Sequence, residues 1–261
     1  DLTNRIANKM IRPTTIPQTL NALKIEQAIA REALRLSFKQ HKEFAVDLKG
    51  IQKERTISDA FEQSGAGNTL VNMLELDMLV GSGGVLSHAP RRSQAARMLI
   101  DAFLPEGITQ LAVDSIFMMP QLGLLSTIHK KAAIEVFEKD CLIYLGSCIA
   151  PVGEQKEKQL ILKYQFKINE KEVVGELRTG EFKLIEAPKG DHEAHLSPGK
   201  NMNIGAGINE IINTKIKGGV VGIFLDGRGR QPFLISKNEN NRFNSLSSWS
   251  QESDEYPEGI N

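Results

Sequence analysis

The sequence predicts an α/β unit over residues 1–140, an all-β barrel or sandwich over 141–240, and a short helix with a polar tail over 241–261. Two observations lead to this fold class. In the first part, helix-forming segments alternate with short apolar runs, which is typical of an α/β layer. After Cys141 the chain is a series of short strand-like runs between turn signals, which is typical of an antiparallel barrel or sandwich.

The elements of the first part follow from apolar spacing and from breaker residues. Pro17 can open the longest helix because the missing N–H of proline costs nothing in a first turn. Gly65 ends a shorter helix. Short apolar runs flanked by glycine or by the turn Pro105–Gly107 predict two buried strands. The expected helices are 2–10, 17–40, 57–63, 92–103, 116–125 and 130–140, and the expected strands are 77–81 and 109–113.

The second part reads as strands only, with turns such as Asn169-Glu170 and Ser197–Gly199 between them. In the tail, residues 242–249 have helical spacing, and the polar end 253–261 is expected to be disordered. The expected strands are 142–149, 159–168, 173–177, 182–186, 193–196, 210–216, 220–225 and 233–235.

The overall composition narrows the class of protein. Lys plus Arg equals Asp plus Glu at 32 each in 261 residues, so net charge suggests no nucleic-acid or membrane partner. No apolar run approaches the roughly eighteen residues of a membrane span, and no signal peptide is recognised. Cys141 and Cys148 form no CxxC pair, which fits a reducing cytoplasm. The chain starts at Asp1 in helical rhythm, as if cut from a longer protein.

The most informative stretch is Asp77–Leu86, where a short apolar run stops in three glycines and one serine. A buried strand that ends in glycines lets a ligand approach the backbone closely, because glycine has no Cβ. Glycines also end strands for purely geometric reasons, and this alternative stays open. The candidate nucleotide-binding residues are Gly81, Ser82, Gly83 and Gly84.

Other residues with reactive side chains give weaker signals. His192 and His195 have a metal-like spacing, but no third ligand follows, so no metal site is predicted. Cys148 lies in an apolar run, where a buried, inert thiol is expected. Neither a GxSxG elbow nor an HExxH motif occurs, and no catalytic residue is assigned.

Two arginine-bearing motifs have both a phosphate-binding and a structural interpretation. In Gly218–Arg230, glycine and arginine alternate after a strand, but no helix follows whose N-terminus could hold a phosphate, so we favour a strand end with a turn. Arg91 and Arg92 open a helix against its dipole, which suggests that other groups hold them.

Five segments together resemble the glutamate mutase L family, which is unrelated to the mismatch-repair protein of similar name. Members of this family are encoded beside adenosylcobalamin-dependent mutases and resemble the actin, hexokinase and sugar-kinase ATPases. The segments are Glu26–Ala33, Gly81–Pro90, Ala112–Gly123, Ile149–Gly153 and Gly218–Arg230.

The resemblance implies that the α/β unit is half of an actin- or hexokinase-like ATPase, in which ATP lies between two lobes. Gly81-Ser82-Gly83-Gly84 is similar to the turn that packs on the adenosine in the second lobe. The phosphate loops have no counterpart in this sequence, so the chain resembles the C-terminal half of a member. ATP and Mg²⁺ are therefore expected in the full-length protein, and none is expected to bind this fragment tightly.

Three functions are compatible with these observations. The first is a fragment of an actin-like ATPase that assists or reactivates an adenosylcobalamin-dependent carbon-skeleton mutase, inactive as an enzyme on its own. The second is a nucleotide-free binding scaffold whose β-rich half docks a partner protein. The third, a small-molecule kinase, has the least support, because no substrate-binding motif is recognised.

Overall fold

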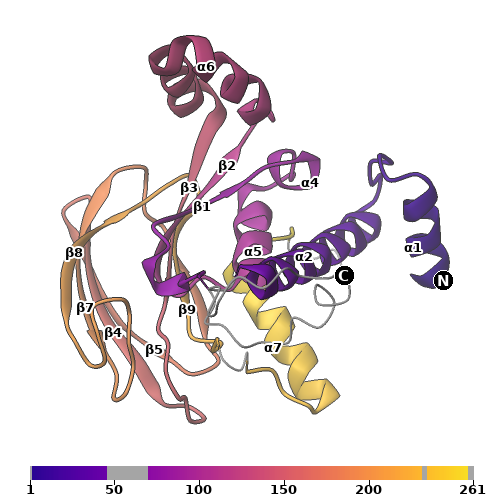
Figure 1. Cartoon of the computed structure of the whole chain (residues 1–261). Coiled ribbons are helices and arrows are strands. Elements are labelled where there is room, and N and C mark those ends of the chain that lie inside the picture. Colours follow the sequence, from indigo (N-terminus) through magenta and orange to yellow (C-terminus); the bar gives the residue numbers. More distant parts are fainter. Residues whose placement is uncertain (1, 46–69, 231–233, 258–261) are drawn as a thin grey trace, which may run out of the picture.

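Two β-sheets packed face to face, with helices on the outer face of the larger one, make up this mixed α/β protein (Figure 1). The computed structural model describes residues 2–45, 70–230 and 234–257. The larger sheet has the strand order β1-β2-β3-β9-β6 and the smaller one β5-β4-β7-β8. The strands are β1 Met78–Gly81, β2 Gly107–Asp114, β3 Leu142–Ala150, β4 Leu160–Ile168, β5 Lys171–Arg178, β6 Phe182–Ile185, β7 Asp191–Pro198, β8 Ile212–Lys217 and β9 Gly222–Asp226.

The helices begin where side chains satisfy the free N–H groups of a first turn. Thr19 caps α2 by accepting a hydrogen bond from the N–H of Ala22, so this helix starts after the expected Pro17. Pro120 lies in the first turn of α6, and the helix kinks at His129. The helices are α1 Leu2–Ile11, α2 Leu20–Phe44, α4 Gly84–Ser87, α5 Arg92–Phe103, α6 Met119–Val136 and α7 Glu239–Glu252, with a 3₁₀ turn at Met73–Glu75 and a π turn at Phe137–Cys141.

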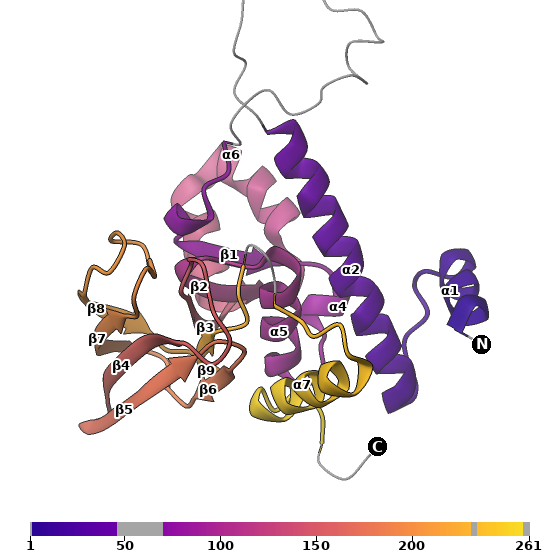
Figure 2. The same cartoon turned by 90° about the horizontal axis from the view of Figure 1, so that it is seen from below.

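The larger sheet is covered on both faces. Strands β1 and β2 are parallel, β2 and β3 antiparallel, β3 and β9 parallel, and β9 and β6 antiparallel. All five residues of β9 are buried: Phe224 packs into the core under α5, whereas Ile223 and Leu225 pack against the smaller sheet. Figure 2 shows α5 against this sheet and α2 outside α5. Strand side chains therefore alternate between two apolar cores.

The smaller sheet is antiparallel throughout, with one face in the core and the other exposed to solvent. In β4, Tyr164 and Phe166 point into the core, and Lys163 and Lys167 point to solvent. The β4–β5 turn has two residues with positive φ, Asn169-Glu170, as tight hairpin turns require. Because one face of the sheet is buried, this alternation fixes the register in which its strands pair with one another.

The mixed α/β class is confirmed, and several finer expectations are not. No closed barrel is formed by the described residues; the two sheets instead pack face to face, as in the sandwich alternative. Strands from both sides of residue 141 share the larger sheet, so the change of pattern there is no break in that sheet. Leu234 and Ile235 are not a strand, and the expected helix 57–63 and Phe233 lie outside the described residues.

The tail is ordered further than expected. Ser253 and Glu255 are buried, so the prediction of disorder is wrong for residues 253–257, while 258–261 lie outside the described residues. Polar composition alone could not show this, because the groups that hold the tail come from α2 and α5.

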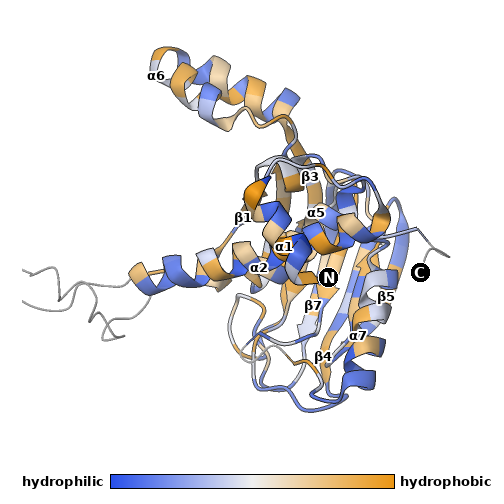
Figure 3. Cartoon of the chain, turned by 90° about the vertical axis from the view of Figure 1, so that its right-hand side faces the viewer, coloured by the Kyte–Doolittle hydropathy of each residue, from blue (hydrophilic) through white to orange (hydrophobic). Residues whose placement is uncertain are grey.

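Helix α6 stands away from the rest of the chain (Figure 3). Three of its large apolar side chains, Leu124, Leu125 and Ile128, are exposed. No helix among the described residues is long and apolar enough to cross a membrane.

Candidate functional site

The glycine turn of Gly81–Gly84 joins β1 to the short helix α4 at the carboxyl end of the larger sheet's parallel pair. Close packing accounts for a glycine at position 81, because a Cβ on Gly81 would lie 3.0 Å from side-chain carbons of Leu86 and of Leu99. This glycine lets α4 and α5 pack closely on the end of β1. Its role is therefore at least partly structural.

Gly83 and Gly84 face open space. A Cβ at either position would meet no atom within 4 Å. Gly83 has a φ of +100°, a backbone conformation that side chains rarely adopt, whereas Gly84 has no such constraint. A bulky residue at Gly83 would thus strain the backbone, but one at Gly84 would only fill the space in front of the turn.

Asp114 belongs to the same edge and was not singled out from the sequence. It ends β2, the parallel neighbour of β1, and is fully buried. Its carboxylate accepts hydrogen bonds from the N–H groups of Ile116 (3.4 Å) and Met119 (3.0 Å), and the Ser82 hydroxyl lies 3.5 Å away. The Ser87 hydroxyl donates to its carbonyl oxygen. Asp114 therefore ties the glycine turn to the start of α6.

The two histidines with metal-like spacing do not converge. A spacing of three residues places them on opposite faces of β7. His192 is buried, with Nε2 2.8 Å from the carbonyl oxygen of Pro188, and the exposed His195 contacts Asn213. Within residues 2–45, 70–230 and 234–257, no group of three or more His, Cys, Asp or Glu side chains is placed to hold a metal ion.

Cys148, on β3, is buried in the core between the larger sheet and α5, as expected. Burial raises the pKa of its thiol to about 12. The thiol is therefore protonated at neutral pH and is not a nucleophile.

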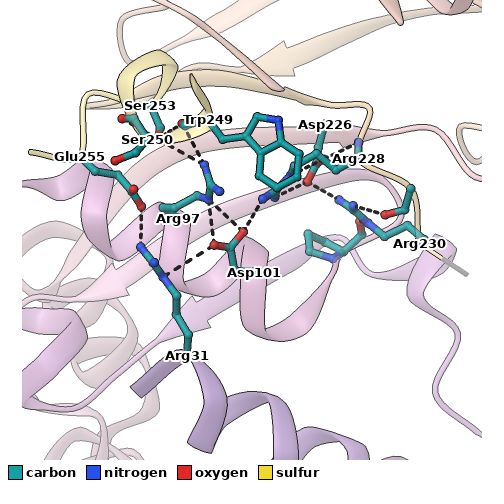
Figure 4. Close-up of polar contacts among 12 residues, drawn as sticks. Arg31, Arg97, Asp101, Asp226, Arg228, Arg230, Trp249, Ser250, Ser253 and Glu255 are labelled. Atoms are coloured by element: carbon teal, nitrogen blue, oxygen red, sulfur yellow. Dashed lines mark hydrogen bonds and ion pairs between the residues drawn. The ribbon is translucent and has the colours of Figure 1, made fainter. Parts of the chain in front are cut away.

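The motif Gly218–Arg230 turns its charges inward (Figure 4). Asp226, at the end of β9, accepts hydrogen bonds from the guanidinium groups of Arg228 at 2.9 and 2.7 Å and of Arg230 at 2.8 Å. Arg228 is 1% exposed and stacks over the rings of Phe182 and Trp249. These arginines are engaged inside the protein, which supports the structural interpretation of the motif over a phosphate site.

The same network joins three helices. Asp101, on α5, accepts a hydrogen bond from Arg228 at 2.7 Å and from Arg97 at 2.9 Å. Arg31, on α2, lies 3.7 Å from Asp101 and donates to Glu255 at 2.5 Å. Arg97 also donates to the Trp249 carbonyl oxygen on α7. We call these charged side chains the buried ion network; its members are Arg31, Arg97, Asp101, Asp226, Arg228, Arg230 and Glu255.

The two arginines at the start of α5, for which the sequence left a phosphate contact and a structural role open, both contact groups of the protein. Arg91 pairs with Asp254, and Arg92 donates to the Ser87 carbonyl oxygen at 2.7 Å.

Because of the buried ion network, we expect the free energy of unfolding to fall at low pH. Burial alone would raise the pKa of Asp101, but Arg97, Arg228 and Arg31 outweigh it and lower the pKa from 3.8 to about 2. A carboxyl whose folded pKa is lowered adds stability above its unfolded pKa and loses it as pH falls through the folded pKa. Asp101 thus contributes about 2 kcal/mol at pH 7, lost between about pH 4 and 2.

This can be measured by urea unfolding of the wild type and of Asp101→Asn between pH 7 and pH 2.5. The difference in unfolding free energy between the two proteins should narrow as the pH falls. A difference that does not change with pH would contradict the assignment.

The family assignment rests on sequence comparison. A family model described as MutL protein matches residues 1–141, which is more than half of the chain. The chain belongs to the MutL family. The resemblance to the glutamate mutase L family is thereby confirmed, and this family is associated with glutamate mutase, a cobalamin-dependent enzyme. No curated protein and no solved structure matches the chain.

The MutL match covers the glycine turn, Asp114 and the helices α2 and α5, and it ends where β3 begins. The smaller sheet and the motif Gly218–Arg230 lie beyond it. Nevertheless, the buried ion network links Arg31 and Asp101 of the matched part to Asp226 of the remainder, so the two parts depend on the same contacts.

Proposed function

We propose that this MutL chain is part of an ATP-dependent, actin-like accessory protein that assists or reactivates an adenosylcobalamin-dependent carbon-skeleton mutase. The adenosine of ATP would lie against Gly81, Ser82, Gly83 and Gly84. The observation that carries the proposal is the open backbone at Gly83 and Gly84, at the carboxyl edge of two parallel strands. Ligands of open α/β sheets bind at this edge.

The electrostatics of the edge suit the uncharged part of the nucleotide. The carboxylate of Asp114 lies 3.5 Å from the Ser82 hydroxyl, so a phosphate bound at Ser82 would be repelled, whereas a ribose or base would not. The phosphates and Mg²⁺ would then be held by the other lobe of the longer protein. Opening and closing of two lobes on ATP hydrolysis can remodel a partner that binds one state better.

A nucleotide-free scaffold is the second candidate. A hollow of about 880 Å³ on the outer face of the smaller sheet favours it, because charged and polar side chains from all four strands of this sheet line it. Lys167, Glu193 and Lys215 are among them. In that case the β-rich half docks a partner protein and the glycine turn binds no ATP.

The present chain alone is expected to show no Mg²⁺-dependent ATP hydrolysis. Phosphoryl transfer depends almost wholly on positioned phosphate and Mg²⁺ contacts, and the sequence has no phosphate-loop motif. A phosphate-release assay on the purified chain tests this, and turnover above the protein-free blank would contradict it.

Mutase recovery tests the proposed function itself. Glutamate mutase inactivated by turnover is incubated with the longer MutL protein, free adenosylcobalamin, and either Mg-ATP or no nucleotide. Recovered mutase activity should require ATP, and Gly84→Val should reduce it. Gly123→Val is the matched control, because Gly123 is also exposed and a Cβ there also meets nothing within 4 Å. Recovery that is independent of ATP would favour the scaffold.

A further inference from the structure

Four residues after α7 lie in a slot between α2 and α5. We call Ser253–Tyr256 the strap. Ser253 and Glu255 are 0% and 2% exposed, although both are polar. The slot itself contains two buried amides, Gln27 of α2 and Gln94 of α5, joined by a hydrogen bond of 3.0 Å.

The slot contacts the main chain of the strap at successive carbonyl groups. The Ser93 hydroxyl donates to the carbonyl oxygen of Asp254 at 2.8 Å, and the Gln94 amide donates to that of Glu255 at 2.8 Å. Arg91 donates to both the carbonyl and the carboxylate of Asp254.

Side chains of the slot also contact the side chains of Glu255 and Tyr256 in the strap. The Arg31 guanidinium donates to the buried Glu255 carboxylate at 2.5 Å. The Tyr256 hydroxyl donates to Gln27 Oε1 at 2.6 Å, and Lys24 lies over its ring. Glutamate and tyrosine are thus both recognised, by groups from one face of α2.

The N–H groups of Ser253, Asp254 and Glu255 bond to carbonyl oxygens of the last turn of α7. The contacts of the strap with α2 and α5, in contrast, are those of a bound peptide rather than of a core segment. A core segment buries aliphatic side chains, and the strap has none. Its polar groups are instead paired one by one, which gives sequence specificity with a modest net gain over water. A segment held by polar contacts, with no buried aliphatic side chains of its own, opens at a lower free energy than the core does.

We propose that the slot between α2 and α5 is a peptide-binding site for a short acidic segment with a Glu-Tyr pair, and that the strap is its resident ligand. Charge complementarity identifies the occupant: Lys24, Arg31 and Arg91 surround a strap that carries Asp254 and Glu255. When the strap leaves, a partner segment of the same chemistry binds in its place. This proposal does not depend on nucleotide binding.

The test uses the full chain and a fluorescein-labelled peptide, Ser-Asp-Glu-Tyr-Pro, followed by fluorescence anisotropy. The double variant Glu255→Ala/Tyr256→Ala, which weakens the resident strap, should bind the peptide at least tenfold more tightly than the wild type. Glu252→Ala, an exposed neighbour, should behave as the wild type. Adding Arg31→Ala to the double variant should weaken peptide binding at least tenfold.

A peptide of the same composition in scrambled order is the specificity control. Equal binding of both peptides, or a folded double variant that binds no more tightly than the wild type, would overturn the proposal. Should the double variant not fold, hydrogen exchange of the wild type with excess peptide replaces it. Faster exchange of the Asp254–Tyr256 amides supports displacement of the strap, and unchanged exchange refutes it.

Discussion

Replacing Asp226 by asparagine should lower the free energy of unfolding by about 3–5 kcal/mol, because it leaves two buried guanidinium groups without their carboxylate. The guanidinium groups of Arg228 and Arg230 both donate to Asp226 within 3 Å. Arg228 also connects Asp226 to Asp101, so the change should weaken the attachment of α5 to β9.

Urea unfolding at pH 7 measures this effect, with Glu32→Gln as the control. Glu32 forms an exposed ion pair with Arg35 on α2, and its loss should cost at most about 0.5 kcal/mol. If Asp226→Asn costs no more than this control, the buried ion network does not stabilise the fold.

The substitution Gly146→Ala should prevent folding or cost more than about 4 kcal/mol. A Cβ on Gly146 would lie within van der Waals overlap of the Gly222 carbonyl oxygen on the neighbouring strand β9. Gly146 also has a φ of +137° and lies at the register shift between β2 and β3. Neither backbone can move away, because both strands are in the middle of the sheet.

Gly190→Ala separates backbone strain from steric clash. Gly190 has a similar φ of +145°, but a Cβ there meets nothing within 4 Å. This control should therefore cost only the strain, about 1–3 kcal/mol. Urea titration of both variants gives the comparison, and equal costs would show that the close approach of β9 to β3 is not what requires Gly146.

Local sequence patterns were enough to predict individual helices and strands. Helix α5 has the expected bounds, because its apolar residues have helical spacing and Leu104 ends it in a left-handed conformation. Strand β4 was recognised as a strand-like run before the turn Asn169-Glu170, and the structure shows its side chains alternating between the core and solvent. Such patterns record which face of an element is buried, but not which element covers it.

The features that depend on partners distant in sequence could not be predicted. In the Gly218–Arg230 motif, for example, Gly219 is required because this segment runs against β3: a Cβ there would lie 2.4 Å from the N atom of Gly146. Likewise, Glu255 is buried because Arg31 lies opposite, 224 residues away in the sequence. The polar composition of the tail gave no signal of the contact with Arg31.

In the candidate site, too, local patterns could be predicted from the sequence and contacts between distant residues could not. Gly83 and Gly84 were identified because an apolar run stops in glycines, and a local pattern suffices for that. Asp114 was missed because its link to Ser82 depends on the parallel pairing of β1 with β2. An acidic residue directly after a predicted buried strand was the only available signal.

The affinity for ATP of the longer MutL protein that the proposed function implies is the most direct test of the nucleotide site. Isothermal titration compares the wild type, Gly84→Val and the control Gly123→Val, and thermal unfolding confirms that each is folded. Because the space in front of Gly84 is open, valine should fill it with little change in melting temperature and weaken ATP binding at least tenfold. The control should bind ATP as the wild type does. Equal affinities for the wild type and folded Gly84→Val would contradict the placement of adenosine at this turn.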